Sequence, residues 1–307
     1  MRLMRLQAGL AVPVAAVLAL SACSTSPAAQ AMDPSQRPAI SVVASTSVYG
    51  DIAKTVGGDA VSVTSILSDP AADPHSYEAN AQTELLLSKA AVVIENGGGY
   101  DDFVDTMLHA SGNTKATVLN AVDISGKAAQ NPADLNEHVF YDFPTMSAVA
   151  AKVTGALSKA APRDAHTFTT NAAAFGSALT RLEQSERDLA AQHAGEGVAI
   201  TEPVPLYLLQ AAGLTNRTPP QFSRSIEDGT DVAPAVLQDT MALFTQHKVA
   251  ALVYNAQTTG PQTEQVLKAA TDNNVAVVPV TETLPRGYTY LSWMSANLAA
   301  LSKALAR

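Results

Sequence analysis

The chain has 307 residues, of which 47% are apolar and 15% charged, and its formal net charge at pH 7 is −9. This apolar content excludes a disordered chain, and the negative charge argues against a nucleic-acid partner. The one cysteine, Cys23, excludes disulfides and a thiolate-rich metal site. At about 150 residues per domain, the length predicts two domains.

The first residues are typical of an export leader. Two arginines precede an uncharged run over residues 8–20, which is shorter than the about 20 residues of a membrane-spanning helix. The sequence Leu-Ser-Ala-Cys at 20–23 resembles the lipobox of bacterial lipoproteins; a secretory signal with an incidental cysteine is the alternative. We expect residues 1–22 to be a signal peptide. Residues 23–38 are then a tether, anchored through lipidated Cys23 to the extracytoplasmic face of the cell membrane.

Short runs rich in Val, Ile and Ala then alternate with helical patterns, which predicts βα units and mostly parallel sheets. Several of the short runs are apolar throughout, as expected for strands covered by helices on both faces. We expect strands at 40–45, 61–67, 91–95, 117–121, 198–201, 250–254 and 275–280, and helices at 81–89, 144–159, 235–247 and 261–273.

One segment, residues 163–194, breaks this alternation. Its apolar residues recur on one helical face, at Phe168, Ala172, Phe175, Leu179, Leu182 and Leu189. About thirty residues at 1.5 Å each span about 45 Å, the length of a lobe. We therefore expect one long rigid helix between an N-terminal α/β lobe (39–162) and a C-terminal α/β lobe (195–307). Two helices of one bundle are the alternative, for which Gly176 offers the only turn signal.

Residues 213–234 show no periodic pattern and contain Thr-Pro-Pro and Asp-Gly-Thr. We expect a long loop without secondary structure here, and such loops are usually functional or mobile. Near the C-terminus, Tyr288, Tyr290 and Trp293 lie in a helix-like segment, where we expect them to pack against the lobe.

Polar candidates for a binding site follow four predicted strands, and ligands of open parallel sheets bind beyond the carboxyl ends of the strands. Two imidazoles and two carboxylates that meet in a cleft would bind a divalent transition metal, since the carboxylates offset the charge of the ion. Taken singly, each residue could equally be an ordinary loop residue. The candidates are His75 in the segment 73–78, His138 in the segment 136–142, Glu202, and the pair Thr281 and Glu282.

Two of these segments carry a family resemblance. Asp-Pro-His-Ser-Tyr-Glu at 73–78 resembles the first metal-binding motif of the bacterial zinc/manganese solute-binding proteins of ABC importers, and Asn-Glu-His-Val-Phe-Tyr-Asp at 136–142 is similar to the second. The resemblance covers essentially the whole mature chain. It implies two lobes joined by a rigid helix, with one Zn²⁺ or Mn²⁺ ion bound in the interlobe cleft as the transported ligand. It also implies a monomer that is no enzyme and delivers the metal to a membrane permease.

Carried over by position, His75 and His138 match the two ligands of the N-terminal lobe, and Glu202 matches the third. The family usually has Asp directly after the last strand, where this chain has Thr281, so we expect Glu282 to be the fourth ligand. Water, Asp228 or Asp231 is the alternative. Asn255 stands where many members have an acid.

The metal stays open at this stage. Glu at the third ligand position and the lack of a His-rich insert favour manganese, whereas intrinsic affinity favours zinc. A secreted zinc hydrolase is the first rival function, but the chain has no His-Glu-x-x-His motif. The second rival is a lipoprotein receptor for a small organic solute, against which the 5% aromatic content argues.

Overall fold

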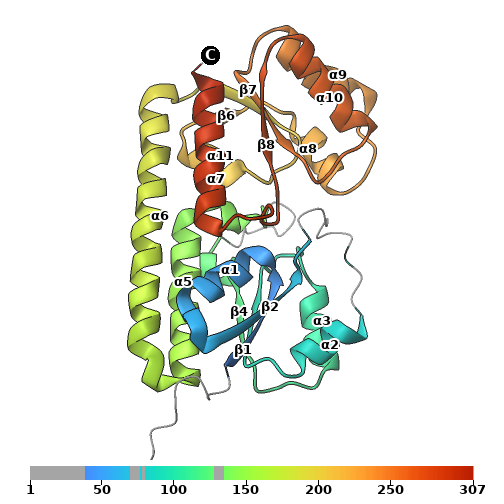
Figure 1. The fold of residues 1–307 in the computed structure, drawn as a ribbon. Helices are drawn as coiled ribbons and strands as arrows, with labels where there is room; N and C mark the ends of the chain where they lie inside the picture. The colour runs from blue at the N-terminus through green and yellow to red at the C-terminus, as the bar shows by residue number, and fades with distance from the viewer. Residues whose placement is uncertain (1–38, 70–76, 78–79, 128–134, 307) are drawn as a thin grey trace, which may run out of the picture. The chain divides into compact units, whose positions relative to one another are not determined.

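A four-stranded parallel sheet builds each half of the chain (Figure 1). The computed structural model describes residues 39–69, 77, 80–127 and 135–306. The predicted signal peptide, the lipidated tether and the predicted ligand His75 lie outside the described residues. Among those described, no helix is both long enough and apolar enough to cross a bilayer.

The first sheet has the strand order β2-β1-β3-β4. All four residues of β3 are buried, as the apolar pattern predicts for a strand covered on both faces. The strand after β1 lies on one side of it and the next strand, β3, lies on the other, so the strand order reverses between β1 and β3. In open α/β sheets, the ligand crevice forms at the carboxyl ends of the two strands where this reversal occurs. The elements of this half are β1 (Ile40–Thr46), α1 (Ser47–Gly57), η2 (Gly58–Ala60), β2 (Val61–Leu67), α2 (Ala81–Leu87), β3 (Val92–Glu95), α3 (Phe103–Ala110), β4 (Thr117–Asn120) and α4 (Ala121–Ser125).

The second sheet repeats this topology, with the order β6-β5-β7-β8 and all pairs parallel. Its crevice therefore lies between β5 and β7. The two similar sheets confirm the predicted two-lobe α/β class. The elements are β5 (Gly197–Ile200), α7 (Leu206–Ala211), β6 (Thr215–Asn216), α8 (Pro220–Glu227), α9 (Pro234–Thr245), β7 (Ala251–Asn255), α10 (Pro261–Asp272) and β8 (Ala276–Val280).

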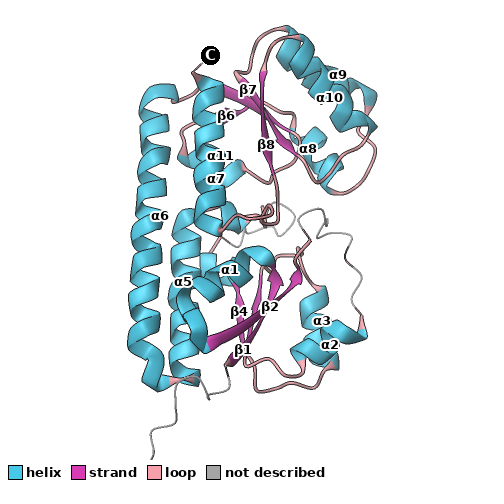
Figure 2. Cartoon of the chain, in the orientation of Figure 1, coloured by secondary structure: helices cyan, strands magenta, loops and turns pink. Residues whose placement is uncertain are grey.

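Three long helices run beside the sheets: α5 (Phe143–Ala160), α6 (Ala165–His193) and α11 (Tyr290–Leu305) (Figure 2). The helix α6 contacts α1 and α5 as well as α7 and α11. It is continuous over 29 residues and passes through Gly176, so the predicted single long helix is confirmed. A 3-10 turn, η6 (Pro162–Asp164), precedes it, because proline favours the first turn of a helix.

The predicted strands all form, and their ends differ from the prediction by at most one residue. The expectation of a loop without secondary structure over 213–234 is wrong, because β6 and α8 lie within it. Pro220 begins α8 at a position where its missing N–H is not needed. Phe222 and Ile226, one helical turn apart, bury one face of this helix.

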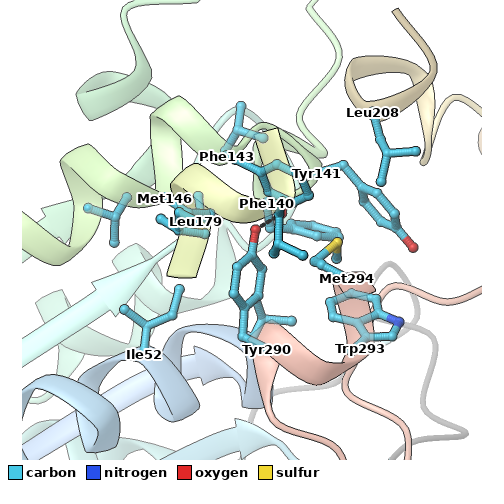
Figure 3. Packing of buried hydrophobic residues seen from close by; sticks show 14 of the residues in the cluster. Ile52, Phe140, Tyr141, Phe143, Met146, Leu179, Leu208, Tyr290, Trp293 and Met294 are labelled. Carbon is cyan, nitrogen blue, oxygen red and sulfur yellow. Dashed lines mark hydrogen bonds between the residues drawn. The ribbon is translucent and has the colours of Figure 1, made fainter. Parts of the chain in front are cut away.

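Several of the largest buried side chains, among them Trp293, Tyr290 and Phe140, gather where α11 meets α6 and the short turn η5 (Val139–Tyr141) (Figure 3). The Tyr290 hydroxyl donates to the carbonyl oxygen of Phe140 at 2.8 Å, and the ring centroid of Trp293 lies 5.5 Å from that of Tyr141. Backbone N–H of Tyr290 also donates to the Asp51 carboxylate of α1 at 2.8 Å. Tyr290 and Trp293 are thus buried as predicted. Tyr288 is 45% exposed, so the packing role expected for it is wrong.

The buried face of α6 contains one acid. Glu186 lies one turn beyond Leu182 and is only 5% exposed. Its side chain lines a cavity of about 200 Å³, whose wall also includes Asp142 and Tyr207. Burial, followed by the nearby charges of Asp142 and Glu183, raises the pKa of Glu186 to about 8. The folded protein therefore binds a proton here that the unfolded chain releases at a lower pH.

This proton makes the stability depend on pH. The free energy of unfolding is expected to fall as the pH rises from about 4.5 to about 8, because the unfolded state binds fewer protons than the native state in this window. Glu186→Gln should remove this loss and stabilise the protein at pH 8.5 by about 1–2 kcal/mol, a discounted value because solvent screens part of the charge. Urea unfolding at pH 5 and pH 8.5 measures the effect. Asp188→Asn, an exposed change on the same helix, is the control. An equal gain at both pH values would contradict the assignment.

Candidate metal site

Side chains from both halves of the chain meet around the ring of His138. His138 directly precedes η5, and the second half supplies acids that follow strands or end a helix. Glu202 follows β5, Glu282 follows β8, and Glu227 is the last residue of α8. The amide residue Asn255 ends β7. The site therefore lies at the carboxyl ends of the second sheet, on the side of the crevice between β5 and β7.

The ring of His138 is fully buried and held in one orientation. Its Nδ1 lies 2.8 Å from the side-chain oxygen of Asn136, which can only accept a hydrogen bond, so Nδ1 is the donor. The amide nitrogen of Asn136 in turn donates to the carbonyl oxygen of Pro203 at 3.1 Å, in the second half of the chain. The rings of Tyr100 and Phe140 contact the imidazole with centroids at 5.7 Å. These contacts direct Nε2 toward the acids.

Two carboxylate oxygens lie close to this Nε2 atom. The distance from Nε2 is 3.4 Å to Oε2 of Glu282 and 3.5 Å to Oε1 of Glu227. Glu137, the residue before His138, brings a further carboxylate, and the candidate ligand atoms of Glu137, His138 and Glu227 all lie within 4.8 Å of one another. One imidazole is therefore surrounded by acids from separate segments.

The acids and the imidazole shift one another's pKa values. Burial lowers the pKa of His138, but the charges of Glu227 and Glu282 outweigh it and raise this pKa to about 9. Burial, with the charge of Glu282 next, raises the pKa of Glu202 to about 7. Burial also raises the pKa of Glu227 to about 8. Buried carboxylates at this density are costly on their own, and a bound dication would stabilise their charged forms.

A single amide connects two of the acids. The Nδ2 atom of Asn255 donates to Oε2 of Glu202 at 2.5 Å and to Oε1 of Glu282 at 2.8 Å. We call Glu202 and Glu282 the carboxylate pair. Both members are almost fully buried, at 3% and 1% exposed. The pair is thus assembled by hydrogen bonds across two strand ends.

The predicted ligands His138, Glu202 and Glu282 all lie in this region, whereas His75 lies outside the described residues. The contacts of Thr281 are to other groups: its hydroxyl donates to the carbonyl oxygen of Thr283 at 3.0 Å, and its own carbonyl oxygen accepts from the Tyr141 hydroxyl at 2.8 Å. The loop acids Asp228 and Asp231, considered as alternatives, are exposed.

Sequence reasoning missed Glu227, whose Oε1 atom lies 3.5 Å from Nε2 of His138. A usable signal existed, because Pro220 followed by Phe222 and Ile226 fits a short helix with one buried face. Such a helix would have placed Glu227 at its end, beside the buried Ile226. The hydrogen bonds of Asn255 to these acids were also missed, although the sequence places Asn255 where many members of the family have an acid.

Comparisons with known proteins show what the chain as a whole is similar to. Residues 42–304 match the family model described as ZnuA, "Zinc-uptake complex component A periplasmic". The manganese-binding lipoprotein MntA of Bacillus subtilis is 29% identical over 175 residues, and the match spans 56% of each chain. The manganese ABC transporter substrate-binding lipoprotein scaA of Streptococcus gordonii is 23% identical over 95% of this chain and 96% of its own. The solved structure of the periplasmic zinc-binding protein TroA from Treponema pallidum has a TM-score of 0.71 and 19% identity, and the match covers 88% of this chain and 100% of that one.

Proposed function

Because the chain belongs to the family of periplasmic zinc-uptake complex component A, we propose that it captures one divalent transition metal ion, Zn²⁺ or Mn²⁺, for an ABC importer. The family is one of transport components, so the chain is not an enzyme and the secreted zinc hydrolase is set aside. A receptor for a small organic solute is also disfavoured, since the acids of the site lie too close to His138 to leave room for an organic molecule between them.

The spacing of donor atoms around His138 carries this proposal. In a four-coordinate site with metal–ligand distances of about 2.0–2.1 Å, neighbouring donor atoms lie about 3.3–3.4 Å apart. The distances of 3.4 Å and 3.5 Å from Nε2 to Glu282 and Glu227 are close to this value. The Nδ1 bond to Asn136 is the kind of outer contact that orients a metal-binding histidine.

The proposed ligands are His75, His138, Glu202 and Glu282, with Glu227 as a further carboxylate at the same centre. For His75 the support is the motif at 73–78 alone. For the others, support comes from the shared crevice at the carboxyl ends of the second sheet. Imidazole together with carboxylate favours a transition metal over Ca²⁺ or Mg²⁺, which prefer oxygen ligands alone.

The chain works outside the cytoplasmic membrane, as the periplasmic family description indicates. We propose further that residues 1–22 are removed as a signal peptide and that lipid on Cys23, through the tether 23–38, holds a monomeric protein at the membrane. The relatives from Bacillus subtilis and Streptococcus gordonii are both named lipoproteins, which supports this anchor. The metal would then be passed to a membrane permease by the lobes 39–162 and 195–307, joined by the helix 163–194.

Metal analysis tests the proposal. The metal-stripped protein should bind one equivalent of Zn²⁺ or Mn²⁺ per chain in a calorimetric titration, and Ca²⁺ and Mg²⁺ at millimolar concentration should not compete, because neither is a good partner for imidazole. Elemental analysis of protein purified without chelators should find the same single ion. Binding of neither transition metal would contradict the proposed function.

A further inference from the structure

Asn255 donates a hydrogen bond to one oxygen of each member of the carboxylate pair. It is 1% exposed and ends β7, between the strand that leads to Glu202 and the strand that leads to Glu282. Its two shortest side-chain hydrogen bonds are the ones to these carboxylates, at 2.5 Å and 2.8 Å. The Thr258 hydroxyl lies 3.2 Å from the same nitrogen. An amide nitrogen carries two hydrogens, so three acceptors share them, and the two acids are the nearest.

The orientation of this amide is fixed by its neighbours. The side-chain oxygen of Asn255 accepts from the backbone N–H of Gln257 at 3.1 Å, and an N–H can only donate. The amide therefore cannot be turned over without placing its oxygen against two carboxylates. The backbone N–H of Asn255 is also held, by the hydroxyl of Thr201 at 2.9 Å.

The result is that each carboxylate has one oxygen committed to Asn255. In Glu282 the committed atom is Oε1, while Oε2 is the atom that lies 3.4 Å from Nε2 of His138. In Glu202 the committed atom is Oε2, and the Thr258 hydroxyl forms another hydrogen bond to the same carboxylate. Glu282 thus turns Oε2 toward the imidazole while its Oε1 accepts from Asn255, and in Glu202 the same amide occupies Oε2.

We propose that Asn255 is a specificity-determining residue, which limits Glu202 and Glu282 to one metal-binding oxygen each and so favours Zn²⁺ over Mn²⁺. This inference rests on the proposed function and deepens it. Zn²⁺ is usually four-coordinate in proteins, whereas Mn²⁺ accepts the same ligands at a higher coordination number. Bidentate carboxylates are the simplest source of the extra oxygens, and the hydrogen bonds of Asn255 compete with the metal for one oxygen of each acid.

The test compares dissociation constants for Zn²⁺ and Mn²⁺, measured by competition with a chromophoric chelator on the metal-stripped full chain. Asn255→Ala should weaken Zn²⁺ binding about 10-fold or more, which is the usual loss of affinity when a residue that holds a metal ligand is removed. It should weaken Mn²⁺ binding less. The ratio of the Mn²⁺ constant to the Zn²⁺ constant should therefore fall severalfold. With Co²⁺ as a probe, the wild type should show the strong visible bands of a four-coordinate ion, and Asn255→Ala the weaker bands of higher coordination.

Two further variants complete the test, a control away from the site and a conservative change of Asn255. Asn113→Ala is the matched control, because its amide nitrogen also donates to two acceptors, the carbonyl oxygens of Leu87 and Ala90, but away from the site. Asn255→Asp retains the size of the side chain and the acceptor for Gln257 but cannot donate, so it should shift the ratio in the same direction if the Ala variant does not fold. A folded Asn255 variant with an unchanged ratio and Co²⁺ spectrum would overturn the role of Asn255. A wild type that binds neither metal would instead overturn the proposed function.

Discussion

Replacing His138 by Ala is expected to weaken the binding of Zn²⁺ and Mn²⁺ by at least about 100-fold, since loss of a direct ligand should exceed the 10–100-fold cost of losing an outer contact. The ring is fully buried and its Nε2 faces the oxygens of Glu282 and Glu227, so the change removes the nitrogen donor beside these acids. Calorimetric titration of the metal-stripped variant measures the loss.

The same change should also destabilise the metal-free protein by about 2–4 kcal/mol, because it removes the cationic partner of Glu227 and Glu282. Added metal stabilises the wild type by mass action, and this gain should be absent in the variant. His166→Ala is the control, because His166 is exposed on α6. Wild-type affinity in His138→Ala would exclude His138 as a ligand, whatever the stability of the variant.

The strands were predictable because each is a nearly continuous apolar run between turn residues, which is the pattern of a parallel strand buried on both faces. The long helix was predictable for a related reason, since its apolar face repeats over 29 residues. Glu186 lies on that face, between Leu182 and Leu189. The helical periodicity predicts that it is buried, whereas its charge predicts that it is exposed. In the structure Glu186 is buried beside a cavity, as the periodicity predicts.

The site was only partly predictable. Glu202 and Glu282 could be found because they follow strands whose carboxyl ends share an edge of the sheet. Glu227 could not be found in this way, because it ends the eight-residue helix α8 and follows no strand. The hydrogen bonds of Asn255 join residues 53 and 27 positions away, and no local pattern encodes such contacts.

The choice between Thr281 and Glu282 as ligand is the second large effect. Glu282→Ala is expected to weaken metal binding by at least about 100-fold, for the same reason as the loss of His138. Its Oε2 atom lies 3.4 Å from the imidazole Nε2, and the side chain is 1% exposed. Thr281→Ala should change the affinity less than about threefold, since the hydroxyl that it removes donates to the nearby carbonyl oxygen of Thr283, a bond worth about 1 kcal/mol. Calorimetric titration of the two variants with the same metal compares them directly.

The backbone explains why the acid can sit one residue later than in the usual family pattern. The carbonyl oxygen of Thr281 accepts from the Tyr141 hydroxyl, and Tyr141 lies in the turn that directly follows His138. Thr281→Ala keeps this carbonyl, so the segment after β8 should remain attached beside the histidine and Glu282 should keep its position. If Thr281→Ala proves the damaging change and Glu282→Ala leaves the affinity intact, the ligand is Thr281, and Oε2 of Glu282 lies near the imidazole only as the partner of its charge.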